Sequence, residues 1–191
     1  MEDNSLKEYK KKRSFRKSPE PSGKKIRAEK SPIFVMQKHD ASHLHYDFRL
    51  QIKDVLKSWA VPKGPSVNPK EKRLAVLTED HPIDYADFEG VIPEGQYGAG
   101  TVMVWDRGVY YNLQDVSMEE AFSKGRIEVE LKGKKIKGGY ALIKTGSSKD
   151  KKWLLIKMKD RFASARRNPV NSGIKSAISN RTLREIEKGE K

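Results

Sequence analysis

Apolar residues in this chain fall into short runs that alternate with polar positions, and turn-forming residues separate the runs. Short alternating runs bounded by proline and glycine are typical of β-strands. Turn signals lie at 62–65, 93–95, 132–134 and 138–139. The pattern therefore predicts a mostly antiparallel β-barrel or β-sandwich. The predicted strands cover residues 33–37, 43–52, 58–61, 73–78, 101–111, 126–131, 140–144 and 153–158.

One helix is predicted near the middle of the chain. Ser117 and Glu120 have the spacing of an N-terminal capping box, and Gly125 stands where a glycine commonly follows a helix. A weaker helical pattern covers residues 183–188. We therefore expect a mostly β fold, compact and antiparallel, with one or two short helices.

The 191 residues suit one domain of ordinary size with an extension at each end. Residues 1–31 contain prolines and a glycine but no periodic pattern, so we expect a basic N-terminal arm there. Residues 32–162 are expected to form the β domain. Residues 163–191 are expected to form a polar C-terminal extension, poorly packed over 164–180.

Composition restricts the chemistry that the chain can carry. It has no cysteine, which excludes disulfides, a thiolate zinc site and a cysteine nucleophile. The net charge of +14 favours a polyanionic partner, either nucleic acid or a membrane surface. Residues 1–30 hold 11 lysines and arginines but no amphipathic helical stripe, which favours nucleic acid. Since the sequence shows neither a signal peptide nor a membrane span, we expect a cytoplasmic protein.

The segment HDASHLHYDFRL, residues 39–50, alternates between apolar and polar side chains. In a strand, residues two apart share one face. The even positions are apolar and are predicted to enter the core; they are Leu44, Tyr46, Phe48 and Leu50. The odd positions carry imidazoles, a carboxylate and a guanidinium; they are His39, His43, His45, Asp47 and Arg49. Such a face differs from the usual lysines, glutamates and threonines of a solvated strand.

A cluster of histidine and carboxylate without cysteine suits Mn²⁺, Zn²⁺, Fe²⁺ or Co²⁺. His45 and Asp47 would project side by side, whereas His39 could join them only if the chain bends near residues 40–42. We expect His43 to be a bystander. Arg49 could hold phosphoryl oxygens next to the metal, or form a salt bridge with Asp47, or do both.

These residues resemble a known family. The run VMQKHDASHLHYDFRL is similar to the signature of the 3′-phosphoesterase domain of bacterial DNA ligase D, of which stand-alone archaeal versions exist. The resemblance continues through SWAVPKGPS, EDHPIDYADFEGVIPEGQYGAGTV and WLLIKMKD, and reaches back to YKKKRSF and SPEP. It covers most of residues 9–160.

The resemblance implies a compact β-barrel that depends on Mn²⁺, with Co²⁺ or Zn²⁺ as other metals. It implies an enzyme that removes a 3′-terminal ribonucleoside and then the remaining 3′-phosphate, leaving a 3′-hydroxyl. The partners implied are DNA or RNA/DNA 3′ ends on a primer-template duplex, in double-strand break repair. A DNA ligase and a polymerase would act with it in trans.

The resemblance also assigns roles to individual residues. It implies that His39, His45 and Asp47 bind the metal, while Arg49, His81 and Tyr85 act at the scissile phosphate. The positions implied to support the site are Arg13, Glu20, Gln37, Lys63 and Arg73. Ser14 departs from the family, which more often has aspartate there, and this affects the expected balance between the two reaction steps. His81 could offset phosphate charge or act as general acid.

Two rival functions share some of these features. Iron oxygenases on β-barrels use two histidines and one carboxylate, but their second histidine follows on a late strand. A nucleic-acid-binding module without catalysis would use the basic arm and leave the histidines idle. Residues 95–100, GQYGAG, lack the spacing of a nucleotide-binding loop and are expected to be turn glycines.

Overall fold

The computed structural model describes residues 4–23, 31–147 and 149–189. The strands are β1 Ile33–Asp40, β2 Leu44–Ile52, β3 Val55–Val61, β4 Lys72–Leu77, β5 His81–Pro82, β6 Gly90–Ile92, β7 Gly100–Asn112, β8 Arg126–Lys132, β9 Lys137–Lys144 and β10 Lys152–Lys157. The helices are α1 Lys7–Lys11, α2 Met118–Ser123, α3 Pro169–Ser172 and α4 Leu183–Glu187, with 3-10 turns η1 Asn4–Leu6 and η2 Ile83–Asp87.

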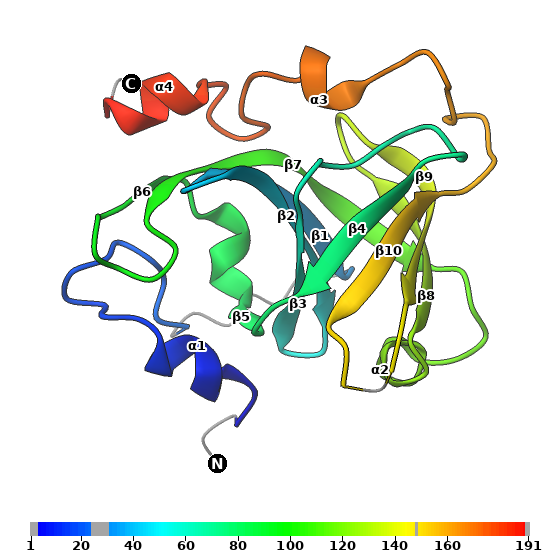
Figure 1. Ribbon diagram of the computed structural model, residues 1–191, viewed down its shortest axis with the longest axis horizontal. Coiled ribbons are helices and arrows are strands. Elements are labelled where there is room, and N and C mark those ends of the chain that lie inside the picture. Colours follow the sequence, from blue (N-terminus) through cyan, green and yellow to red (C-terminus); the bar gives the residue numbers. More distant parts are fainter. Residues whose placement is uncertain (1–3, 24–30, 148, 190–191) are drawn as a thin grey trace.

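Among the described residues, eight antiparallel strands close into a barrel (Figure 1). Their order is β1-β2-β3-β4-β10-β9-β8-β7, and the ring closes because β7 also pairs with β1. β6 pairs with the start of β7, and β5 pairs with Val55 and Leu56 at the start of β3. The predicted compact β-barrel is confirmed, and the sandwich alternative is not observed.

The barrel interior is filled by large apolar side chains. Trp59, Trp105 and Trp153 are fully buried there, together with Phe34 and Phe48. A second apolar cluster lies outside the barrel wall, where Val35 of β1 and Val104 of β7 pack against α1 and η2 residues. β1 is therefore covered on both faces, which explains its continuous apolar run.

The predicted helix is present as α2, and the Ser117 hydroxyl accepts a hydrogen bond from the Glu120 amide at 3.2 Å. The weaker tail helix is present as α4, with Thr182 and Glu185 forming a full capping box. The short elements α1, α3, β5 and β6 are not predicted from the sequence. They are too short for their periodicity to stand out.

The described part of the N-terminal arm, residues 4–23, packs against the outer wall of the barrel. Tyr9 of α1 is fully buried, and its hydroxyl donates to the Pro21 carbonyl at 2.6 Å. Glu20 is only 4% exposed. The expectation for residues 1–3 and 24–30 of the arm lies outside the described residues.

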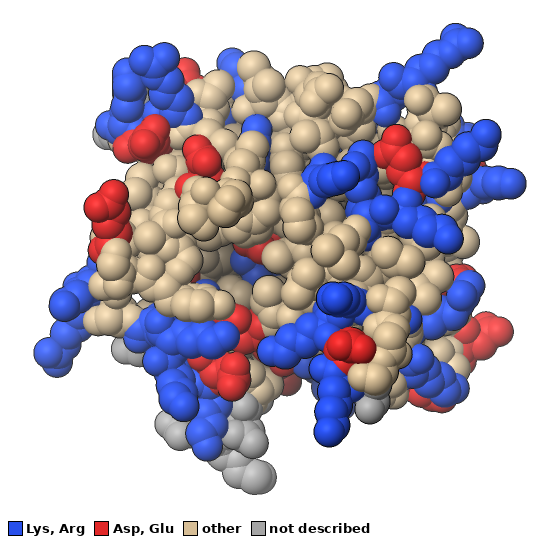
Figure 2. Space-filling view, in the orientation of Figure 1, with Lys and Arg blue, Asp and Glu red and all other residues tan. Residues whose placement is uncertain are grey.

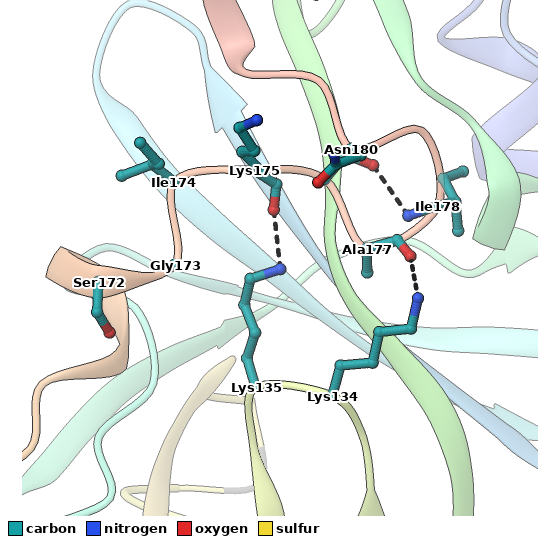
Figure 3. A pocket seen from close by; sticks show the side chains of 10 residues that line it. Lys134, Lys135, Ser172, Gly173, Ile174, Lys175, Ala177, Ile178 and Asn180 are labelled. Carbon is teal, nitrogen blue, oxygen red and sulfur yellow. Dashed lines mark hydrogen bonds between the residues drawn. The ribbon is translucent and has the colours of Figure 1, made fainter.

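The C-terminal extension is tied to the barrel more closely than its polar composition predicts. Lys134 donates to the Ala177 carbonyl at 2.6 Å, and Lys135 donates to the Lys175 carbonyl at 2.8 Å (Figure 3). Ile186 of α4 joins the cluster of the barrel interior. Lysine ammonium groups here donate to backbone carbonyls of the extension, and such contacts have no local sequence signature.

No helix in the described part of the chain is long and apolar enough to cross a membrane. Lysine and arginine side chains are prominent on the face shown in Figure 2, which also has a hollow near its centre.

Candidate metal centre

The site lies on the outer face of the hairpin formed by β1 and β2. The strands pair so that His39 faces His45, Gln37 faces Asp47, and Val35 faces Arg49. Residues 41–43 form the bend between them, so the stretch 39–50 is two strands rather than one. Cross-strand neighbours on one face lie close together. The hairpin therefore brings His39 beside His45 and Asp47.

The alternation predicted for β2 is observed. Tyr46, Phe48 and Leu50 are buried in the barrel interior, whereas Asp47 and Arg49 point to the outer face. Leu44 departs from the pattern, since it lies at the start of β2 and is 47% exposed. His43 lies in the bend and is exposed, as a bystander would be.

His39, His45 and Asp47 offer three ligand atoms that all lie within 4.8 Å of one another. Asp47 Oδ2 is 3.6 Å from His39 Nδ1, and Asp47 Oδ1 is 3.6 Å from His45 Nε2. Four-coordinate metals with bonds of roughly 2.1 Å hold their ligand atoms roughly 3–4 Å apart. The two 3.6 Å separations between Asp47 and the imidazoles therefore fit a single divalent ion.

The ring nitrogens that face away from Asp47 are occupied by backbone carbonyls. His39 Nε2 lies 2.9 Å from the Gly98 oxygen, and His45 Nδ1 lies 2.9 Å from the His43 oxygen. A carbonyl only accepts, so in the neutral rings these nitrogens carry the protons. The other nitrogens then direct lone pairs toward the carboxylate, which is the tautomer that a metal ligand requires.

The charge on Asp47 is maintained despite its burial. Burial opposes ionisation, but the Arg49 guanidinium and the two imidazoles hold the pKa of the Asp47 carboxyl well below its usual value. Burial also acts against the charged form of His45, yet its contact with Asp47 leaves the pKa of that imidazole raised. A cation between these groups would replace the protons that they share.

Arg49 is held on three sides. Its Nε donates to Gln37 Oε1 at 2.8 Å, its Nη2 donates to Asp47 Oδ2 at 3.2 Å, and its Nη1 lies 3.0 Å from His81 Nδ1. Arg49 can form the salt bridge with Asp47 and still offer N–H groups to a ligand, because a guanidinium has five N–H donors. Arg49 is buried but lines the cavity, so its remaining donors can reach a ligand there.

His81 of β5 lies between two guanidinium groups. Its Nδ1 is 3.0 Å from Arg49 Nη1, and its Nε2 is 3.2 Å from Arg13 Nη2. Burial, Arg49 and Arg13 together lower the pKa of His81 well below its usual value. The ring is therefore neutral at pH 7, an arrangement that suits a hydrogen-bond partner better than a proton donor.

The N-terminal segment closes one side of the site through an ion-pair network. Arg13 Nε donates to Glu20 Oε1 at 2.8 Å, and its Nη1 donates to Glu79 Oε1 at 2.9 Å. Tyr85 donates its hydroxyl proton to Glu20 Oε1 at 3.0 Å. Burial first, and then Glu20, raise the pKa of Tyr85 well above its usual value, so the phenol stays protonated. Arg13 thus holds Glu20 and Glu79 in place and has few N–H donors left to bind a ligand.

These groups line a cavity of about 290 Å³. Tyr97, Thr78 and Ala41 also contribute to its wall. A larger cavity of about 580 Å³ lies beside residues 172–180, next to the two lysines of Figure 3. Those lysines are already bonded to carbonyls, so the smaller cavity is the better candidate for chemistry.

The structure brings together most of the site residues that the sequence predicts. Gln37 supports the site, since its Nε2 donates to the Tyr85 and Phe88 carbonyls. Lys63, which follows β3, and Arg73 of β4 line a separate pocket, and Arg73 pairs with Glu71. Their supporting role stays a prediction.

Comparison with known proteins identifies the family. The family model described as "DNA Ligase D 3'-phosphoesterase domain" matches residues 37–144, which include the β1–β2 hairpin from Gln37 onward. The chain belongs to the DNA ligase D 3′-phosphoesterase domain family. The family resemblance inferred from the sequence motifs is confirmed.

Curated relatives agree with this family. The chain is 50% identical over 183 residues to the "Multifunctional non-homologous end joining protein LigD" of Pseudomonas aeruginosa, covering 93% of this chain and 22% of that protein. It is 46% identical over 157 residues to the protein of the same name from Mycolicibacterium smegmatis, covering 80% of this chain and 20% of that protein. The chain thus spans about a fifth of the length of these relatives.

Three contributors to the site are missed by reasoning from the sequence. Glu79 holds Arg13, the Gly98 carbonyl fixes His39, and the Ser58 hydroxyl lies 3.3 Å from His81 Nδ1. A backbone carbonyl has no sequence signal. Ser58 could have been found from its register, because it faces Arg49 across β2 and β3.

Proposed function

We propose that the chain is a metal-dependent phosphoesterase that repairs the 3′ ends of DNA or RNA/DNA primer-templates. In the first reaction, water cleaves the bond between phosphorus and the 5′ oxygen of a terminal ribonucleoside, which leaves a 3′-phosphate. In the second, water cleaves that phosphate from the 3′ oxygen and leaves a 3′-hydroxyl. The observation that carries the proposal is the His39–His45–Asp47 group beside Arg49, in a chain of this family.

The three ligands would hold a divalent transition metal, with Mn²⁺ proposed and Co²⁺ or Zn²⁺ as other metals. Bound there, the ion supplies Lewis acidity toward a phosphoryl oxygen. Arg49 directs its free N–H groups into the cavity and can offset charge on the remaining phosphoryl oxygens. Its bonds to Gln37 and Asp47 keep it in place before substrate binds.

The Glu79 carbonyl lies 2.9 Å from His81 Nδ1 and only accepts, so the neutral ring carries its proton on Nδ1 and accepts a hydrogen bond from Arg13 Nη2 at Nε2. Tyr85 lines the cavity with its hydroxyl bonded to Glu20, and its ring lies 4.9 Å from the Arg49 guanidinium. We propose that both contact the scissile phosphate or its ribose. Arg13 and Glu20 act by positioning them.

The partners proposed are nucleic acid 3′ ends, together with a DNA ligase and a polymerase that act in trans; the words "end joining" in the relatives' name support a role at DNA ends. The net charge of +14 supports a polyanionic substrate. Affinity is therefore expected to fall steeply with salt, because each phosphate contact releases counterions.

The deciding experiment uses a 5′-labelled primer-template that ends in a single 3′ ribonucleotide. With Mn²⁺, we expect the primer to shorten to a 3′-phosphate product and then to a 3′-hydroxyl product. A chelator should stop both steps. Binding without shortening or phosphate release would instead support a non-catalytic end-binding module.

A further inference from the structure

Tyr97 lines the candidate cavity but has no part in the chemistry proposed above. It lies in the loop between β6 and β7, where Gln96 N donates to the Pro93 oxygen and Ala99 N donates to the Gln96 oxygen. The next residue, Gly98, has φ +76 and gives its carbonyl to His39 Nε2. The loop that carries Tyr97 is therefore anchored directly to a proposed metal ligand.

The end of this loop is fixed by close packing. A Cβ atom at Gly100 would lie 2.1 Å from the Asp40 oxygen, at the end of β1. Only glycine allows this approach, and its φ of +138 is a further demand for glycine. The loop thus holds the backbone on both sides of Tyr97 against the hairpin.

The Tyr97 side chain is unusual in this setting because it is large, aromatic and 49% exposed. Lys12 Nζ lies 4.9 Å from the ring centroid, and Arg13 Cζ lies 5.4 Å from it. These cations contact the ring but leave half of the residue open to solvent. An aromatic face that is positioned yet uncovered, beside a phosphate-binding group, is suited to stacking on a nucleobase.

We propose that Tyr97 is a stacking platform for the base of the last nucleotide of the strand. The inference rests on the proposed function, since it names how the substrate end is held at the same site. Stacking accepts any base, because every base has a π face. The cavity of about 290 Å³ has room for the end of one strand rather than for a duplex.

The test compares four proteins: wild type, Tyr97→Leu, Tyr97→Phe and a matched control, Tyr111→Leu. Tyr111 of β7 is 48% exposed, close to the value for Tyr97, but does not line the cavity. The probe is a primer-template with 2-aminopurine at its 3′ terminus, bound in the presence of a chelator so that no hydrolysis occurs. Its fluorescence falls when the base stacks. A second probe carries 2-aminopurine well upstream.

Wild type, Tyr97→Phe and Tyr111→Leu are expected to quench the terminal probe, whereas Tyr97→Leu is not. In turnover with Mn²⁺, KM of Tyr97→Leu should rise roughly tenfold or more, while kcat stays within about threefold. The upstream probe should respond equally to all four proteins. A fifth protein, Tyr97→Trp, should keep a low KM, and its own fluorescence should change when the strand end binds.

If Tyr97→Leu matched wild type in quenching and KM, the stacking role would be overturned while the proposed function stood. A KM defect shared by Tyr97→Phe would also overturn it, because the ring face is intact in that variant. Wild-type protein that neither bound nor cleaved the substrate would overturn both proposals. Thermal unfolding of each variant checks that the N-terminal segment stays packed.

Discussion

Glu20 offers a sharp test of whether the N-terminal segment is part of the folded site. Its carboxylate is 4% exposed and accepts hydrogen bonds from Arg13 Nε at 2.8 Å, Ser18 Oγ at 2.8 Å and the Tyr85 hydroxyl at 3.0 Å. The change Glu20→Ala removes the acceptor of all three hydrogen bonds. It leaves a buried guanidinium with one carboxylate fewer, and a buried phenol without a partner.

The expected cost follows from these contacts. Breaking a buried ion pair by removing one partner costs about 3–5 kcal/mol. Arg13 keeps its bond to Glu79 at 2.9 Å, so we expect the lower end, about 3 kcal/mol. For a domain of this size, that loss lowers Tm by about 6–12 °C. The urea midpoint should fall by roughly 1–2 M.

The assay is urea unfolding of wild type and variant, followed by tyrosine and tryptophan fluorescence. The matched control is Glu119→Gln, which removes an exposed pair with Lys53 at 3.1 Å and should leave the midpoint unchanged. Turnover should also fall in Glu20→Ala, since Arg13 and Tyr85 lose their common anchor. A midpoint equal to that of the control would refute the packing of residues 4–23 against the barrel.

Three further predictions concern the metal group, the loop glycine and acid stability. The variant His45→Ala should lose both reactions and bind Mn²⁺ at least tenfold more weakly by calorimetry. Its Tm should be unchanged, because the His45 side chain lies at the surface of the site. Full activity of the variant would exclude His45 as a metal ligand. Gly100→Ala should destabilise the fold by at least about 2 kcal/mol more than Gly95→Ala. A Cβ atom at Gly100 would lie 2.1 Å from the Asp40 oxygen, whereas a Cβ atom at Gly95 would have nothing within 4 Å. Equal urea midpoints of the two variants would contradict this prediction. Burial opposes ionisation of Glu79, but hydrogen bonds that include one from Arg13 leave its pKa lowered. The ionised carboxylate should therefore stabilise the fold fully above the unfolded pKa, and this stabilisation should be lost as pH falls below about 4.5. The drop in urea midpoint between pH 6 and pH 3.5 should be smaller in Glu79→Gln than in wild type.

The interior and exterior faces of β2 follow from the sequence because alternation is a local property of an extended backbone. Phe48 and Leu50 must lie opposite Asp47 and Arg49 in any strand, whatever the rest of the fold does. The N-terminal caps of α2 and α4, formed by Ser117 and Thr182, are equally local. For this reason the apolar face, the polar face and both of these helices are correctly predicted, and the long motifs also identify the family.

The family resemblance already implied that distant residues such as His39 and Arg13 belong to the site, but only the tertiary structure decided how they meet. His39 meets His45 because the chain reverses at residues 41–43 and sets the register, and Arg13 meets Glu79 because the N-terminal segment packs on the outer wall. Closure of the barrel through β1 and β7 likewise depends on pairing across the whole domain. Such contacts join residues far apart in sequence, and their stability comes from shared burial rather than from any local preference.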